Sequence, residues 1–168
     1  AGRDRTTIHG GGFRIQGTRD KGKRVVLRGI TMKGSSRCGL LNDNGLSFLC
    51  KDMTFTQCGY SGVFAKNTKG RLINCVITQC GWSGIFCSEN ALIELEGDQT
   101  KIDGNNTSGY DDEYGLTTYN TSSRIHLLSP LTKESVSTNN GGGGDCGNYS
   151  SESIGIIQTV STFEEALP

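Results

Sequence analysis

The sequence contains few of the residues that build helical proteins. Ala occurs four times and Pro twice in 168 residues, whereas Gly, Ser, Thr and Asn together supply 69. Because Ala favours helices while Gly, Ser and Asn favour turns, this composition argues against helical bundles and doubly wound α/β folds. The hydrophobic residues, 33% of the chain, fall in short runs, which argues against a disordered polymer as well.

Long apolar runs are also missing. No segment approaches the roughly 20 apolar residues that a membrane-spanning helix needs. The polar, basic start at residues 1–5 does not have the pattern of a signal peptide. We therefore expect no membrane partner, and the abrupt start and end favour a module of a larger protein.

The chain has no net charge, but its charges are unevenly distributed along the sequence. The chain has 17 Lys and Arg against 17 Asp and Glu. Residues 1–88 hold 14 of the basic and 4 of the acidic side chains, whereas residues 89–168 hold 3 and 13. The chain therefore has a basic and an acidic half, and in a solenoid this order predicts a charge dipole along the axis.

The sequence contains a clear internal repeat. Residues 56–64, TQCGYSGVF, recur 22 residues later at 78–86 as TQCGWSGIF. Weaker copies lie at about 30–41 and about 102–116, and the second of these is lengthened by an insertion at about 106–114. Within each copy, apolar residues alternate over short runs that end in Gly, Asn or Ser, which is typical of short strands.

A repeat of strands and turns this short cannot bury its own apolar face, so neighbouring copies must stack. We predict an all-β fold, a right-handed parallel β-helix of about five to six coils over residues 7–140. Equivalent positions should then lie about 4.8 Å apart. The predicted inward rows are Leu27 over Cys50 over Leu72, Met32 over Phe55 over Ile77, and Leu40 over Val63 over Ile85. Asn44 and Asn67 are predicted to stack at one turn.

The repeat also resembles a known group. An alternating strand, a Thr-x-Cys-Gly corner and a Gly-hydrophobic-hydrophobic step are similar to the repeats of pectin-lyase-like carbohydrate enzymes, mannuronan epimerases and the substrate-binding region of some F-box proteins. The resemblance spans about residues 7–140 and implies the β-helix fold. It leaves the function open among lyases, hydrolases, epimerases and binding modules.

Two segments fall outside the repeat. Residues 141–153 are predicted to form a flexible Gly-rich linker. Residues 154–168 are predicted to form a strand followed by a short helix that Thr162 would cap. This tail either caps the solenoid or begins a further domain.

The cysteines do not have the pattern of a metal site. There are seven, without a C-x-x-C pair, and the two His residues lie far apart in the sequence. Most of the cysteines fall in or beside apolar strand positions, so we predict core thiols, no metal and no cofactor. Unpaired thiols slightly favour a reducing compartment, whereas sequons at Asn105, Asn106, Asn120 and Asn148 point the other way, and the compartment stays open.

Catalytic residues are not evident in the sequence. The dense acidic run at residues 111–113 lies in the insertion and is predicted to be a solvated loop. No carboxylate pair recurs at coil spacing on one face, and no Ser-His-Asp order or phosphate loop is present. The sequence therefore predicts no catalytic residue.

Aromatic residues at equivalent positions are the best candidate site. Tyr60 and Trp82 occupy one corner of adjacent coils, and Leu41, Phe64 and Phe86 should form an outward apolar stripe. Exposed rings suit a sugar or a partner's apolar side chains. The apolar part of the 154–168 tail is the other predicted cover for this stripe.

Basic residues crowd the first two coils. The candidates for an anion-binding face are Arg14, Arg24, Arg28 and Arg37. Such a face suits an acidic polysaccharide or a phosphorylated peptide, or it only prevents aggregation of an exposed edge. Nucleic acid is disfavoured because the sequence has no recognition helix and no aromatic-basic RNA motif.

We therefore predict a binding or scaffold module for a glycan or protein ligand. One alternative is a carbohydrate-active enzyme, a lyase or epimerase acting on an anionic polysaccharide. Another is a structural protein that associates head to tail through its oppositely charged ends.

Overall fold

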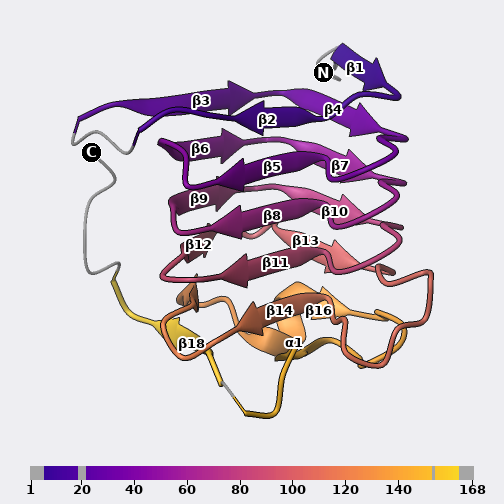
Figure 1. The fold of residues 1–168 in the computed structure, drawn as a ribbon, viewed down its shortest axis with the longest axis vertical. Helices are drawn as coiled ribbons and strands as arrows, with labels where there is room; N and C mark the ends of the chain where they lie inside the picture. The colour runs from indigo at the N-terminus through magenta and orange to yellow at the C-terminus, as the bar shows by residue number, and fades with distance from the viewer. Residues whose placement is uncertain (1–5, 19–21, 153, 163–168) are drawn as a thin grey trace.

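The computed structural model describes residues 6–18, 22–152 and 154–162. It is a right-handed parallel β-helix in which three six-stranded parallel sheets run along one axis (Figure 1). Each coil contributes one strand to each sheet, so the solenoid has six coils. The predicted fold class is confirmed.

The three sheets are called A, B and C in the order in which the first coil meets them. Sheet A contains β1 (Thr6–His9), β4 (Ile30–Lys33), β7 (Thr54–Thr56), β10 (Val76–Thr78), β13 (Lys101–Asp103) and β16 (Ser137–Thr138). Sheet B contains β2 (Phe13–Ile15), β5 (Leu40–Asp43), β8 (Val63–Lys66), β11 (Ile85–Ser88), β14 (Leu116–Tyr119) and β17 (Cys146–Asn148). Sheet C contains β3 (Arg24–Arg28), β6 (Ser47–Lys51), β9 (Lys69–Ile73), β12 (Leu92–Glu96), β15 (Arg124–Leu128) and β18 (Ile156–Val160).

The strand register follows the sequence repeat. Val63 pairs with Ile85, so the two copies that lie 22 residues apart occupy adjacent coils. The predicted inward rows are confirmed by the pairing of Met32 with Phe55 and of Cys50 with Leu72. These side chains are 0–1% exposed, because the inner faces of the three sheets share one core.

The turns between sheets B and C depend on left-handed backbone conformations. Asn44 and Asn67 both have positive φ, and the Nδ2 of Asn67 donates to the Oδ1 of Asn44 at 2.7 Å, as the predicted amide stack requires. Glu89 and Asn120 take the same conformation on the next two coils. Asn tolerates this region better than most residues, so these turns repeat without a glycine at this position.

The last coil extends past the predicted boundary at residue 140. Cys146–Asn148 pairs with β14, so the segment expected to be a linker contains a strand. Ile156–Val160 pairs with β15 in sheet C, and this part of the tail therefore does not cover the stripe on sheet B. The helix predicted after Thr162 lies outside the described residues.

One short helix was not predicted. It is α1 (Lys133–Val136), where Thr132 and Ser135 form a capping box. No helix in the described part of the chain is long and apolar enough to cross a membrane.

Gly70 makes room for a core aromatic ring, which gives a test of the coil packing. It pairs with Phe48, and a Cβ at residue 70 would lie 2.1 Å from the Phe48 Cζ. Because Phe48 is fully buried and cannot move away, Gly70→Ala should lower the free energy of unfolding by about 1–3 kcal/mol in urea denaturation. Gly11→Ala is the matched control, since its Cβ would meet only the Ile8 Cγ2 at 3.7 Å. Equal stability of the two variants would contradict this packing.

Candidate functional site

The outer face of sheet B carries the predicted apolar stripe. Arg14 pairs with Leu41, Leu41 with Phe64, and Phe64 with Phe86, so the four side chains form one outward ladder. The Phe64 and Phe86 rings stack with centroids 5.3 Å apart and planes 7° apart. The alternate residues Leu40, Val63 and Ile85 are fully buried, which confirms the predicted inward row. The outward side chains are less exposed than predicted, because Leu41 and Phe64 are half-buried and Phe86 is only 9% exposed.

A second ladder runs along the corner between sheets A and B. The backbone N–H of Tyr60 donates to the Arg37 carbonyl, and the N–H of Trp82 donates to the Tyr60 carbonyl. Arg37, Tyr60 and Trp82 therefore follow one another on successive coils. The Tyr60 and Trp82 rings stack at 4.2 Å with planes 17° apart, which leaves no space for a sugar ring between them. A ligand can therefore meet the edges of this pair, but it cannot lie between the two rings.

The insertion between β13 and β14 folds against this corner. Tyr110 meets the Trp82 ring edge-on, with centroids 6.2 Å apart and planes 90° apart. The acidic run was predicted to be solvated, and Asp111 and Asp112 are exposed as expected. For Glu113 the prediction was wrong, because this side chain is only 4% exposed.

Glu113 is held by the hydroxyl group of Ser83 on the neighbouring coil. The Ser83 Oγ donates to the Glu113 Oε2, and the same Ser83 Oγ lies 2.5 Å from the Thr117 Oγ1. The Tyr114 N–H donates to the Thr117 Oγ1 at 3.0 Å, which fixes this hydroxyl pair. Burial raises the pKa of the Glu113 carboxyl, while the hydrogen bonds from Ser83 oppose the rise and the charge of Asp112 adds to it.

Asn106 fixes the loop that carries Glu113. The Asn106 Nδ2 donates to the carbonyl oxygens of Tyr110 at 2.7 Å and Glu113 at 2.8 Å. Asn105 and Asn106 are both 1% exposed, and their amides are committed to such bonds. These two sequons are therefore inaccessible to glycosylation in the folded chain.

Ser61 lies at the same position as Ser83, one coil nearer to the N-terminus. The N–H of Gly62 donates to the Ser83 carbonyl at 3.1 Å, which sets this alignment. Ser61 is 1% exposed, and its Oγ has no hydrogen-bond partner among the described residues. A buried hydroxyl without a partner costs about 1–3 kcal/mol, so this group favours any ligand that can satisfy it.

These elements enclose a groove of about 320 Å³ on sheet B. It is lined by Ser61, Phe64, Lys66, Trp82, Phe86, Ser88, Glu89, Glu113, Tyr119 and Tyr149. Tyr149 packs edge-on against Phe86 at 5.6 Å and against Tyr119 at 5.5 Å, which closes the groove towards the last coil. The groove thus runs between two aromatic ladders and contains a buried carboxyl and buried hydroxyls.

The predicted basic residues divide between two faces. Arg14 and Arg37 continue the two ladders that border the groove, but they lie on the first two coils. Arg24 and Arg28 are on β3 in sheet C, on a different side of the solenoid. The structure therefore does not bring the four arginines together into one anion-binding face.

The two carboxyls that line the groove have different partners. Glu113 accepts from the Ser83 hydroxyl, whereas Glu89 follows β11 and lies 3.4 Å from the Lys66 ammonium. Glu89 is therefore part of an ion pair, while Glu113 is bound by a hydroxyl.

The cysteines fit their predicted role in the core. All seven are free thiols, and Cys50, Cys58, Cys75, Cys80 and Cys87 are buried. Burial raises the pKa of Cys87 to about 12 and that of Cys38 to about 11, so these thiols remain protonated at neutral pH. Within the residues that the structure describes, no three His, Cys, Asp or Glu side chains gather as metal ligands would.

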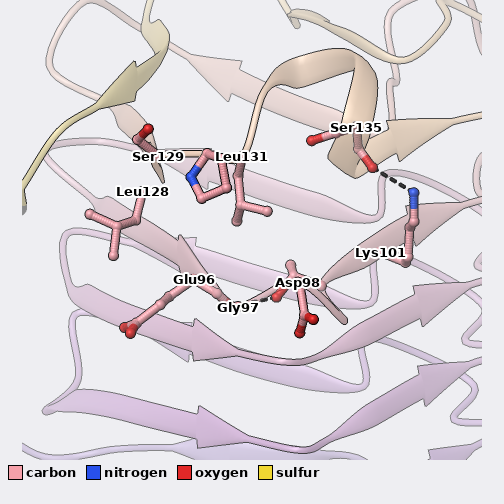
Figure 2. A pocket seen from close by; sticks show the side chains of 10 residues that line it. Glu96, Gly97, Asp98, Lys101, Leu128, Ser129, Leu131 and Ser135 are labelled. Atoms are coloured by element: carbon pink, nitrogen blue, oxygen red, sulfur yellow. Dashed lines mark hydrogen bonds between the residues drawn. The ribbon is translucent and has the colours of Figure 1, made fainter.

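A second hollow lies between the turn after β12 and the loop that leads to α1 (Figure 2). Its volume is about 490 Å³. The Lys101 Nζ there donates to the Ser135 carbonyl at 2.5 Å, and the buried Thr100 hydroxyl donates to the Glu96 carbonyl at 2.5 Å. Because these polar groups already have partners, the groove on sheet B is the stronger candidate site.

Sequence reasoning missed seven of the ten residues that line the groove: Ser61, Lys66, Ser88, Glu89, Glu113, Tyr119 and Tyr149. Ser61 was visible as the repeat partner of Ser83, but small residues at a corner did not stand out. Glu113 and Tyr119 follow the insertion, which breaks the 22-residue spacing, and Tyr149 lies in the segment expected to be a linker.

Comparison with known proteins agrees with this architecture. A family model described as the right-handed beta helix region matches residues 4–130. No curated protein matches the chain, and no solved structure does.

The buried carboxyl gives a pH-dependent test of the groove. Because the folded pKa of Glu113 lies above its unfolded value of about 4.3, the folded state holds this proton more tightly. Stability contributed by this group is therefore lost as pH rises from that unfolded value through the raised folded pKa. Glu113→Gln removes the buried charge but can still accept from Ser83, so its melting temperature should exceed that of the wild type at pH 8.

The difference in melting temperature should shrink towards zero below pH 4, where both side chains are neutral. Asp111→Asn is the control, because it removes an exposed charge from the same loop. A difference between Glu113→Gln and wild type that does not change with pH would contradict the assigned burial of Glu113.

Proposed function

The chain belongs to the right-handed β-helix family, and we propose that this module binds a glycan chain in the groove on sheet B. The observation that carries the proposal is the set of buried polar groups between two aromatic ladders. Ser61 and Glu113 line the groove, are 1% and 4% exposed, and can form hydrogen bonds with a ligand there. Sugars present both hydroxyls and apolar ring faces, so they match such a mixed surface.

The shape of the groove favours an extended ligand. Equivalent side chains repeat about every 4.8 Å along the axis, which is close to the length of one sugar unit. The tyrosines at the rim, Tyr60, Tyr119 and Tyr149, are 38–41% exposed and present hydroxyls to solvent. A chain lying along the axis would meet ring edges at its sides and hydroxyl groups beneath it.

The glycan proposal is tested by removing Trp82, the ring of the corner ladder that lines the groove. A glycan array should identify a bound oligosaccharide, and isothermal titration should then give its affinity for Trp82→Ala. Because a central aromatic anchor contributes about 1–2 kcal/mol or more, the affinity should fall about tenfold. Arg28→Ala, on sheet C, is the control and should bind like the wild type.

Melting curves of Trp82→Ala are needed to show that the coils remain folded, since Trp82 also stacks on Tyr60. Ser61→Ala provides a milder second variant, with an expected loss of about threefold to tenfold. The proposal fails if no oligosaccharide binds, or if folded Trp82→Ala and Ser61→Ala both retain full affinity.

We propose a second property, head-to-tail association, because the coils follow one another along the axis in chain order (Figure 1) and the first and last coils carry opposite charges. Exposed Arg14, Arg28 and Lys33 lie on the first two coils, whereas exposed Glu134 and Asp145 lie on the last. Among the described strands, each terminal strand of the three sheets pairs with one neighbour only. Such edges can accept another parallel coil.

Sedimentation at low and high salt tests this association. Attraction between opposite ends is screened within about 10 Å at 0.1 M salt, so the mass should fall towards that of a monomer as salt rises. Arg28→Glu should lower the mass at low salt. A monomer at every salt concentration would exclude head-to-tail stacking.

A further inference from the structure

The charges that line the groove are unevenly balanced. Its cation, Lys66, lies 3.4 Å from the Glu89 carboxylate and 3.8 Å from Asp43. Asp43 pairs with Lys66 on the adjacent strand of sheet B, and Glu89 lies at the turn of the following coil. The positive charge of Lys66 is therefore already compensated. Within the described ranges, no comparable cation faces Glu113, whose hydrogen bonds come from hydroxyl and backbone groups.

The arginines near the groove are too distant to neutralise Glu113. Arg14 is three coils from Phe86, roughly 14 Å along the axis, and Arg37 is two coils from Trp82, roughly 10 Å away. Arg24 and Arg28 are on another sheet. A carboxylate on a ligand in this groove would therefore meet Glu113 without a compensating positive charge.

The surroundings of Glu113 strengthen that repulsion. Trp82 and Phe86 line the groove beside it, and Tyr119 and Tyr149 close one end. Aromatic walls exclude water and lower the local dielectric, so two negative charges repel one another more than they would at an open surface. A sugar hydroxyl, in contrast, can donate to a carboxylate or pair with the unsatisfied Ser61 Oγ.

We propose that the groove selects uncharged sugars with free hydroxyl groups and rejects uronates, and that Glu113 is the residue that sets this selectivity. The inference rests on the proposed glycan-binding function and names its ligand class. The proposed ligand class therefore differs from the anionic polysaccharide that the basic half of the sequence suggested. The basic residues lie at one end of the solenoid, whereas the groove lies at its centre and towards the acidic end.

A matched pair of ligands tests the selectivity. Oligogalacturonate and its methyl ester share one sugar skeleton and differ in charge, and neutral oligosaccharides of equal length complete the set. The titrations are run at pH 8 because burial raises the pKa of Glu113 and an alkaline pH favours its charged form. The wild type should bind the ester and the neutral chains at least about tenfold more tightly than the free acid, the ratio that about 1.4 kcal/mol of repulsion gives.

Glu113→Gln is the decisive variant, because it keeps the shape of the side chain and an acceptor for Ser83 while removing the charge. It should reduce the preference for ester over acid to within about threefold, mainly by improving the binding of the acid. Asp111→Asn, an exposed charge in the same loop, should leave the preference unchanged.

The outcomes separate the two proposals. If none of these sugars binds the wild type, the glycan-binding function is wrong and the selectivity falls with it. If sugars bind but the free acid binds as tightly as the ester, the function stands and the selectivity is overturned. The selectivity is equally overturned if Glu113→Gln retains the full preference of the wild type.

Discussion

The stacking of parallel coils in one fixed register is the constraint on which the whole structure depends. Each inner strand pairs with the strand one coil above and with the strand one coil below, so a residue's place in the repeat determines its place on a face. The pairing of Phe64 with Phe86 makes both an outward ladder and a wall of the groove. A shift of one residue would exchange that wall with the buried row of Val63 and Ile85.

The groove arises where the regular repeat is interrupted. The register that pairs Ile85 with Leu116 places Tyr114 opposite Ser83, but the residues before it come from an insertion. Asn106 folds this insertion back on itself, and Glu113 reaches the hydroxyl of the preceding coil. The scaffold therefore supplies Ser61, Ser83 and the stacked rings by repetition, while the carboxyl comes from an insertion that departs from the pattern. Functional groups are expected at such departures.

Most of the fold could be predicted from the sequence because the coils repeat one pattern of inward apolar residues and turn residues. The identity of residues 56–64 with 78–86 was enough to align the inward rows and the Tyr60–Trp82 corner. The site was only half predictable, since burial of Glu113 depends on how a non-repeating loop folds. Tyr149 was missed for a related reason: a Gly-rich composition predicts flexibility, but it does not reveal that an open sheet edge will pair with the segment.

The same register explains why the neutral total charge does not determine the ligand. In the described coils, position along the chain is position along the axis (Figure 1), so exposed arginines of the first two coils and exposed acids of the last coil lie at opposite ends. Beyond about a Debye length, roughly 8–10 Å in physiological salt, the basic end contributes little to the potential inside the groove. The local carboxyl of Glu113 therefore governs which ligand is tolerated there, whereas the charged ends govern how whole molecules approach one another. The burial of Glu113 and the unpaired hydroxyl of Ser61 both lower the stability of the folded state. Both groups line the groove, where a bound ligand could offset this loss of stability.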